Sequence, residues 1–208
     1  MEATLERDDW LTNWAACTPT QVAGLFSAYR GRWWIAGGWA IDLFAGGSNR
    51  KHADIDIELL RSEQHLLHEV LPGWQIFACR FPGKDILHLW PAGEVLPLEV
   101  HDIWCRPTTD SPWALQLMLM DHEGESWIYR RDARIGGLID ALGIEAQGLP
   151  VIAPEIQLLF KSKGRLAKDE FDLDLALPLL NDDRRDWLIN ALTVSDPTNP
   201  WIERLRAN

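Results

Sequence analysis

The sequence is short of positive charge. Its 208 residues include 20 Lys and Arg against 31 Asp and Glu, which gives a formal charge of −11. Proteins hold nucleic-acid backbones through clustered Lys and Arg, so this balance argues against a protein that binds long nucleic acid. It favours a cationic or neutral partner, or an anionic partner that is held through metal ions.

The chain also lacks a long apolar run. The longest run near the start, Trp33–Ile41, has nine residues and contains two glycines, whereas a membrane-spanning helix needs about 20 apolar residues. The opening Met-Glu-Ala-Thr-Leu-Glu-Arg-Asp-Asp has neither the basic nor the apolar region of a signal peptide. We therefore expect no membrane partner.

Cysteine is scarce, and several familiar motifs are missing. Cys17, Cys79 and Cys105 are an odd number without metal-ligand spacing, which predicts reduced thiols in a cytoplasmic protein. The sequence contains no Gly-x-x-x-x-Gly-Lys, Gly-x-Ser-x-Gly or Gly-x-Gly-x-x-Gly, so none of these motifs supports a P-loop, an α/β-hydrolase or a dinucleotide-binding protein.

What is present indicates an ordinary globular protein. Apolar residues make up 47% of the chain and charged residues 25%, and the length suits one domain or two small ones. Twelve tryptophans are unusual for this length. We expect most of them in the core and several along a pocket, where a flat ring can stack on a base or sugar.

The hydrophobic pattern predicts an α+β front part and a helical back part. Thr18-Pro19 begins a helix, Ser62 caps another, and Lys168–Leu177 and Arg184–Leu192 have helical periodicity, as does the segment that follows Pro154. We expect residues 1–150 to form a catalytic domain and residues 151–208 a helical C-terminal region. The predicted strands are Trp33–Ala36, Asp54–Leu59, Trp74–Phe81, Ile86–Trp90, Leu96–Trp104, Leu115–Met120 and Ser126–Arg130.

Two aspartates stand out on one predicted strand. Asp54 and Asp56 alternate with Ile55 and Ile57, so their side chains point to the same face. Neighbouring carboxylates repel each other unless a cation lies between them, and hard oxygen ligands suit Mg²⁺. Taken alone, the pair is more typical of a charged strand face in water.

A glycine pair precedes these aspartates and strengthens the case. Gly37-Gly38 follows an apolar strand and opens a helix, where backbone N–H groups attract phosphate. Arg50 and Lys51 lie just before the acids. They meet a triphosphate in one interpretation and form a solvated loop in the other.

A third carboxylate is predicted on a later strand. In Leu98-Glu99-Val100-His101, Glu99 and His101 share one face of the predicted strand, and Glu99 would ligate a metal or accept a proton. Asp102 and Glu58 are weaker alternatives. In the predicted strand, Asp102 falls on the same face as the apolar residues Leu98 and Val100.

These segments resemble the nucleotidyltransferase superfamily. Gly-Gly-Trp-Ala-Ile-Asp followed by Arg-Lys-His-Ala-Asp-Ile-Asp-Ile is similar to the small aminoglycoside and lincosamide antibiotic nucleotidyltransferases, in particular the aminoglycoside-2''-adenylyltransferase-like family. The resemblance implies a mixed sheet flanked by helices and then a helical C-terminal part. It maps the family's glycine pair to Gly37-Gly38, its paired acids to Asp54 and Asp56, and its third acid, usually aspartate, to Glu99.

The resemblance also implies a reaction. A nucleoside monophosphate would pass from an NTP, ATP in the adenylyltransferases, to a hydroxyl of a small molecule, with two Mg²⁺ ions at Asp54, Asp56 and Glu99. Lys161, in a segment that resembles the family's C-terminal helices, would reach a phosphate. An aminoglycoside or a lincosamide antibiotic is the candidate acceptor, and a resistance role is one consequence.

Two other classes stay open from the sequence. The glutamate at the third-acid position is compatible with a catalytically silent nucleotide-binding protein, with a regulatory or antitoxin-like role. A purely structural interaction protein is the third candidate. The sequence does not indicate the oligomeric state.

Overall fold

The computed structural model describes residues 4–5, 13–79 and 86–207. Residues 1–3 and 6–9 of the opening segment, and the last residues of the strand predicted at Trp74–Phe81, lie outside the described residues. The chain divides into two compact units, Met1–Trp34 with His52–Asp121, and Ile35–Lys51 with His122–Asn208. Within the described residues, no helix is both long and apolar enough to span a membrane.

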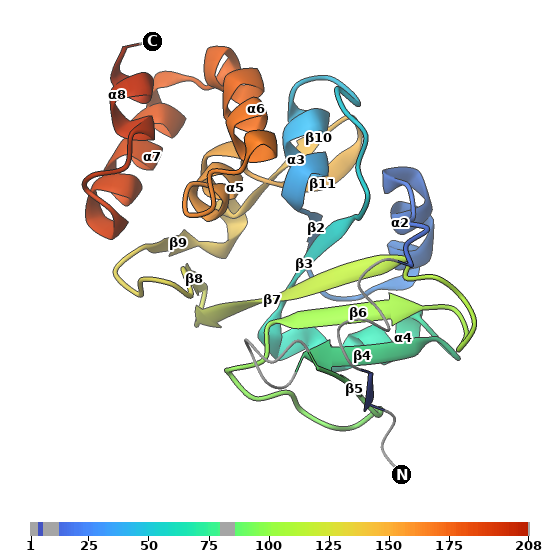
Figure 1. Cartoon of the computed structure of the whole chain (residues 1–208). Coiled ribbons are helices and arrows are strands. Elements are labelled where there is room, and N and C mark those ends of the chain that lie inside the picture. Colours follow the sequence, from blue (N-terminus) through green and yellow to red (C-terminus); the bar gives the residue numbers. More distant parts are fainter. Residues whose placement is uncertain (1–3, 6–12, 80–85, 208) are drawn as a thin grey trace. The chain divides into compact units, whose positions relative to one another are not determined.

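The first unit is built on a sheet whose strands follow the order β1-β5-β4-β6-β7-β3 (Figure 1). Only β3 and β7 run parallel, and the other pairs are antiparallel. The strands are β1 (Thr4–Leu5), β3 (Asp56–Leu60), β4 (Gln75–Cys79), β5 (Leu87–Leu89), β6 (Asp102–Arg106) and β7 (Leu115–Glu123).

Short helices complete the first unit. Helix α2 (Pro19–Leu25) begins as predicted at Thr18, whose hydroxyl accepts from the Gln21 backbone N–H while the Gln21 side chain accepts from the Thr18 N–H. This capping box satisfies two N–H groups that the helix leaves without partners. The predicted helix after Ser62 is a 3₁₀ helix, η2 (Arg61–Leu66), followed by the single turn α4 (Leu67–Val70).

The β3–β7–β6 part of this sheet has two unlike faces. One face is purely apolar, and its side chains are at most 2% exposed: Ile57, Leu59, Ile76, Ala78, Ile103, Cys105, Leu115, Leu117 and Leu119. The other face carries Asp56 and Glu58 beside Gln116, Met118 and Asp102, and continues into an aromatic cluster of Phe77, Trp104 and Trp113. The alternation of acid and apolar residues thus predicts the buried face correctly.

The second unit contains short strands and most of the helices. Ile35 of β2 (Trp33–Ile35) pairs in parallel with Val151 of β11, which pairs with β10, and β8 pairs with β9. The predicted glycine pair opens a helix, which begins at Gly37. The strands are β8 (Ser126–Ile128), β9 (Gly136–Leu138), β10 (Gly143–Ala146) and β11 (Leu149–Ile152), and the helices are α3 (Gly37–Phe44), α5 (Pro154–Lys161), α6 (Ala167–Ala176), α7 (Asp182–Ser195) and α8 (Trp201–Arg206).

The back half therefore becomes helical where the sequence predicts it, since β11 ends at Ile152 and α5 begins at Pro154. Proline at the first helical position costs no hydrogen bond, because that N–H has no partner inside the helix. The compact units follow a different division of the chain, so a separate role for residues 151–208 stays a prediction.

Candidate functional site

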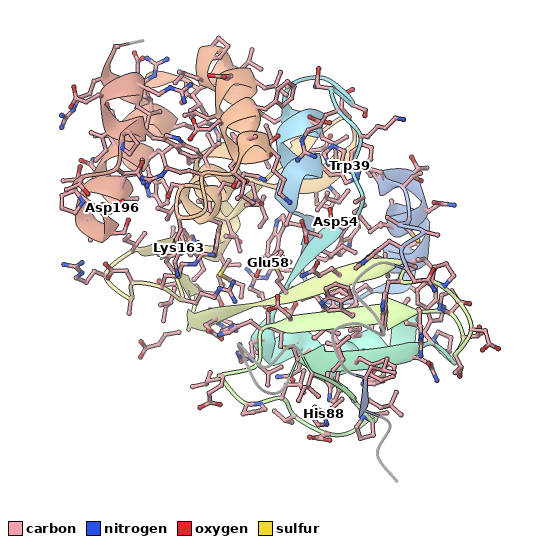
Figure 2. The ribbon with its side chains drawn as sticks, in the orientation of Figure 1. Trp39, Asp54, Glu58, His88, Lys163 and Asp196 are labelled. Atoms are coloured by element: carbon pink, nitrogen blue, oxygen red, sulfur yellow. The ribbon has the colours of Figure 1, made fainter. Side chains whose placement is uncertain are left out.

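Asp54 and Asp56 flank the start of β3 in the first unit. Ile55 and Ile57 are fully buried, which anchors the strand, and the two aspartates are half-buried. The Ile55 carbonyl accepts from the Gln116 N–H at 3.1 Å, so the backbone between the acids is tied to β7. Figure 2 labels Asp54 and Glu58, which lie at different levels along this strand.

Glu99 lies apart from this pair. The strand predicted at Leu96–Trp104 begins only at Asp102, and Glu99 is an exposed residue in the preceding turn. The turn has a local cause, because the Val100 N–H bonds back to the Pro97 carbonyl at 3.1 Å and proline has no N–H to give to a sheet. The predicted sharing of one strand face by Glu99 and His101 is therefore wrong.

The register of the sheet decides which residues neighbour Asp56. Gln116 is its partner on β7, and Trp104 is the partner of Gln116 on β6. One row further along, Glu58 pairs with Met118, which pairs with Asp102. With strands about 4.8 Å apart and about 3.3 Å per residue, the Cα atoms of Asp56 and Asp102 are roughly 12 Å apart, and Glu99 lies three residues beyond Asp102.

This register corrects the assignment of Asp102 to the apolar face. Asp102 shares the face of Glu58 and Trp104, while Ile103 and Cys105 face the other way. The alternation of polar and apolar residues does not identify the faces of β6, because this strand buries large apolar side chains on both of them. Gln116 was not among the predicted residues, although a glutamine between Leu115 and Leu117 was a visible break in an apolar strand.

Arg61 holds the turn that carries Glu99. Its guanidinium donates to the carbonyls of Pro97 at 3.0 Å and Val100 at 2.9 Å, and it pairs with Asp121. It also lies 3.0 Å from Nδ1 of His101. Because Arg61 directly follows β3, this one side chain joins the end of the acid strand to the start of β6.

Gly37 and Gly38 open α3 in the second unit. Gly37 has a φ of 64°, a left-handed conformation that glycine adopts without strain. Its N–H donates to Oε1 of the buried Gln157 at 2.8 Å. The predicted glycine turn is therefore present at the helix start, and one of its N–H groups already has a protein acceptor.

Two of the predicted phosphate-binding cations are paired within the second unit. Arg50 binds the fully buried Asp172 through Nε at 3.0 Å and Nη2 at 3.2 Å. Lys161 lies 2.8 Å from Asp172 and 3.3 Å from Asp169. Two cations and two carboxylates balance in this network, whereas Lys51 is exposed.

Asp42, which the sequence analysis did not select, fixes the loop that follows α3. It is fully buried and accepts from the backbone N–H groups of Asn49 at 2.9 Å and Arg50 at 3.4 Å. An aspartate inside the apolar stretch Trp39-Ala-Ile-Asp-Leu-Phe is the signal that points to it. This contact determines where the chain between the glycine pair and Arg50 runs.

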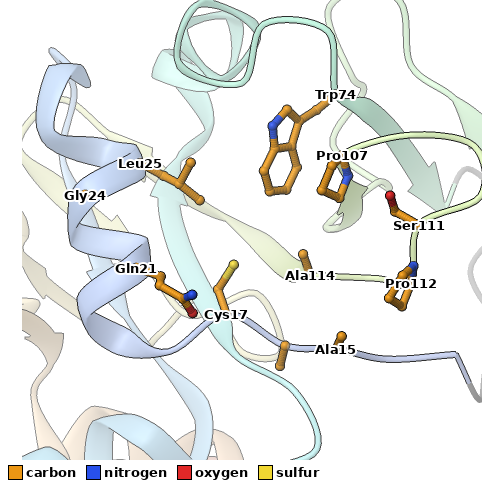
Figure 3. Close-up of a pocket in the computed structure, with 11 residues that line it drawn as sticks. Ala15, Cys17, Gln21, Gly24, Leu25, Trp74, Pro107, Ser111, Pro112 and Ala114 are labelled. Atoms are coloured by element: carbon orange, nitrogen blue, oxygen red, sulfur yellow. The ribbon is translucent and has the colours of Figure 1, made fainter.

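A cavity of about 640 Å³ opens elsewhere in the first unit (Figure 3). Trp74 faces Gly24 and Leu25 of α2 across it. Several tryptophans were expected along a pocket, and Trp74 is the tryptophan that lines this one. Burial raises the pKa of the Cys17 thiol in its wall, so the thiol is neutral there. No predicted site residue lines this cavity, whose other walls are Ala15, Ala16, Gln21, Pro107, Ser111, Pro112 and Ala114.

Solved structures show the class of fold. The lincomycin-bound lincosamide antibiotic adenylyltransferase LnuA superposes with a TM-score of 0.53 at 19% identity, over 78% of this chain and 96% of that one. The antibiotic-resistance factor ANT(2'')-Ia, solved in solution, gives 0.53 at 14% identity, over 90% and 94%. The fold is thus of the nucleotidyltransferase type, which confirms the predicted α+β class.

Sequence comparison points to the same family. Residues 20–78 match the family model for aminoglycoside-2''-adenylyltransferase. A lincosamide resistance protein of Staphylococcus haemolyticus is 25% identical over 155 residues, which are 73% of this chain and 88% of that protein. These matches confirm the resemblance to the antibiotic nucleotidyltransferases.

The donor chemistry of the acid pair fits magnesium. Asp54 and Asp56 offer hard carboxylate oxygens, and Mg²⁺ is commonly held by one or two carboxylates together with substrate phosphates. In the part of the chain that the structure describes, no three His, Cys, Asp or Glu side chains come together as a metal site. The pair therefore fits a cation that arrives with phosphates better than a cage made by the protein alone.

Proposed function

We propose that this protein is a Mg²⁺-dependent nucleotidyltransferase that moves the nucleoside monophosphate of an NTP, ATP first among them, to a hydroxyl of a small molecule. The observation that carries the proposal is the pair of half-buried aspartates on either side of buried Ile55, at the start of β3. The likeness in fold and sequence to antibiotic adenylyltransferases supports the same reaction. Aminoglycosides and lincosamides are the acceptors to test first.

Each chain segment has a role in this reaction. Asp54 and Asp56 hold Mg²⁺, which when bound neutralises the phosphates and favours ionisation of the acceptor hydroxyl. The residues around them orient the hydroxyl for in-line attack on the α-phosphorus, and pyrophosphate leaves. The backbone N–H of Gly38 and the exposed side chain of Lys51 are assigned to the phosphates, while Gly37, whose own N–H is bonded to Gln157, supplies the turn that opens α3.

The remaining predicted residues take secondary roles. Arg50 and Lys161 are each held by Asp172, so their charges are balanced by carboxylates and their role is to fix the segments that pack around α3. A direct role for Glu99, as a ligand of the first Mg²⁺ or as the proton acceptor, is a proposal that its exposed position in a turn does not favour. A second Mg²⁺ ion that would neutralise the triphosphate is also a proposal. We place the protein in the cytoplasm, where ATP and reduced thiols are found.

The net charge of the chain indicates which class of acceptor to expect. A chain with a formal charge of −11 attracts polycationic aminosugars, and half-buried carboxylates such as Asp54 and Asp56 bind ammonium groups directly. A lincosamide carries less charge and would depend more on apolar contact. Long nucleic acid is not among the proposed partners.

A catalytically silent nucleotide-binding protein is the second candidate. It is favoured by one observation, namely that the described residues bring no third carboxylate to Asp54 and Asp56. A regulatory or antitoxin-like protein would keep nucleotide binding and lose transfer.

One assay separates the two functions. The purified protein is incubated with Mg²⁺, each NTP in turn and a panel of aminoglycosides and lincosamides, and pyrophosphate release is measured. We expect release that depends on one NTP and one acceptor class and that is lost in Asp56→Asn. Nucleotide binding without release for every acceptor would support the silent protein instead.

A further inference from the structure

Gln116 is the residue of β7 that lies opposite Asp56. The parallel register of β3 and β7 pairs the two residues, and the antiparallel register of β7 and β6 pairs Gln116 with Trp104. Residues that pair in this way point to the same face of the sheet, about 4.8 Å apart. The Gln116 amide therefore lies between a carboxylate and an indole ring.

The side chain of Gln116 is polar without a structural reason. Its neighbours Leu115 and Leu117 are fully buried on the opposite face, and Gln116 itself is half-buried. Its backbone N–H bonds to Ile55, but within the described residues its amide group makes no hydrogen bond. This amide is therefore available to a ligand that reaches Asp56.

A second glutamine of the same sheet shows the contrast. Gln75 of β4 accepts from Nε of Arg106 at 2.9 Å and donates to Thr109 at 2.9 Å. Its amide is thus used at both ends by the protein. Gln75 therefore provides a matched control for Gln116.

We infer that the third donor beside Asp54 and Asp56 is the neutral amide of Gln116, and that Glu99 does not take this position. The inference rests on the proposed function and deepens it. An amide oxygen is a hard donor that Mg²⁺ accepts, yet it adds no negative charge. The site then has two carboxylates, which bind a free divalent cation weakly and favour the cation that arrives with a nucleotide's phosphates.

The experiment measures cation binding directly, apart from catalysis. Mn²⁺ replaces Mg²⁺, and free Mn²⁺ is measured by electron paramagnetic resonance with the full-length protein, without nucleotide and with a non-hydrolysable ATP analogue. We expect Gln116→Glu to tighten Mn²⁺ binding without nucleotide about tenfold, because the number of charged ligands tunes cation affinity. Glu99→Gln and the control Gln75→Glu are expected to bind as the wild type does.

A second variant makes the test independent of added charge. Gln116→Met keeps the side-chain length and removes both polar atoms, and we expect it to weaken binding of the Mn²⁺–nucleotide complex several-fold. If Glu99→Gln weakens this binding while both Gln116 variants behave as wild type, the inference is overturned.

The same measurements distinguish failure of the inference from failure of the proposed function. Asp56→Asn tests the function itself, since it should abolish binding of the Mn²⁺–nucleotide complex. If the wild type and Asp56→Asn bind equally, the proposed function fails and the inference fails with it. If Asp56→Asn loses binding and the Gln116 variants do not change it, only the inference fails.

Discussion

Asp172 in the second unit and Asp56 in the first are both carboxylates that the fold withdraws from water, but their surroundings differ. Asp172 is fully buried and is held by Arg50 and Lys161. Asp56 is half-buried, and the residue that pairs with it on β7 is an uncharged amide. The first arrangement neutralises charge inside the protein, whereas the second places a carboxylate beside an amide that carries no charge. A charged residue that is typical of a functional site can thus be structural, and its partner decides which.

The strongest test of this comparison removes the buried carboxylate. Asp172→Ala leaves two cations without their shared partner, and breaking a buried ion pair in this way costs about 3–5 kcal/mol. We expect a fall of that size in the free energy of unfolding, measured by urea denaturation. Asp174→Asn, on the same helix and exposed, is the control and should change stability by less than about 1 kcal/mol. Equal effects of the two variants would contradict the structural role of Asp172.

The matching change in the acid strand should affect activity and spare stability. Asp56→Asn is expected to lower pyrophosphate release about 10²–10³-fold, as loss of one preorganised electrostatic group does. The free energy of unfolding should stay the same or rise, because the repulsion from Asp54 is removed. Asp110→Asn, an exposed carboxylate of the same unit, serves as control. A variant that unfolds without losing activity would place Asp56 with Asp172 as a structural residue.

Arg61 and Arg30 extend the comparison to arginines. The Arg61 side chain is 10% exposed and pairs with Asp121, whereas that of Arg30 is 74% exposed and pairs with Glu69. Arg61→Ala should cost roughly 2–3 kcal/mol, because buried carbonyls and a carboxylate lose their donor. Arg30→Ala should cost about 0–1 kcal/mol. Thermal and urea unfolding of both variants check this, and a similar loss in the two would refute the clamp role of Arg61.

The smallest effect concerns a half-buried histidine that has no charged partner among the described residues. His68 packs on Trp90 with ring centroids 4.5 Å apart, and burial lowers its pKa below the ordinary value of 6.5. The unfolded state then binds the proton more readily, so the free energy of unfolding should fall as pH drops through 6.5 towards the lower folded-state pKa.

The measurement for His68 compares slopes of stability against pH. Urea denaturation between pH 7.5 and 5.5 should show a smaller decline in His68→Phe than in the wild type, since phenylalanine keeps the ring contact and does not titrate. His65→Gln, at an exposed position of η2, should keep the wild-type decline. An unchanged slope in His68→Phe would show that His68 is not the group responsible.

Much of the fold could be predicted from local patterns. The alternation at β3, the capping box at Thr18 and the apolar periodicity after Pro154 each depend on residues close in sequence, and the structure confirms them. The sequence analysis missed β9, β10 and β11. These strands are three or four residues long and begin or end near glycines. They are too short to show the alternation of a strand, and glycine has low β propensity, so neither signal identifies them in the sequence.

The sequence alone determined the residue types of the site, because a pair of aspartates and a pair of glycines on alternating and capping patterns are local features. Only the tertiary structure decided their neighbours. Strand pairing brought Gln116 to Asp56 and left Glu99 in a turn, and helix packing brought Asp172 to Arg50 across 122 residues. The physical reason is that sheet register and buried ion pairs are selected by the burial of whole elements against one another, so residues far apart in the chain become neighbours through energies that no local pattern contains.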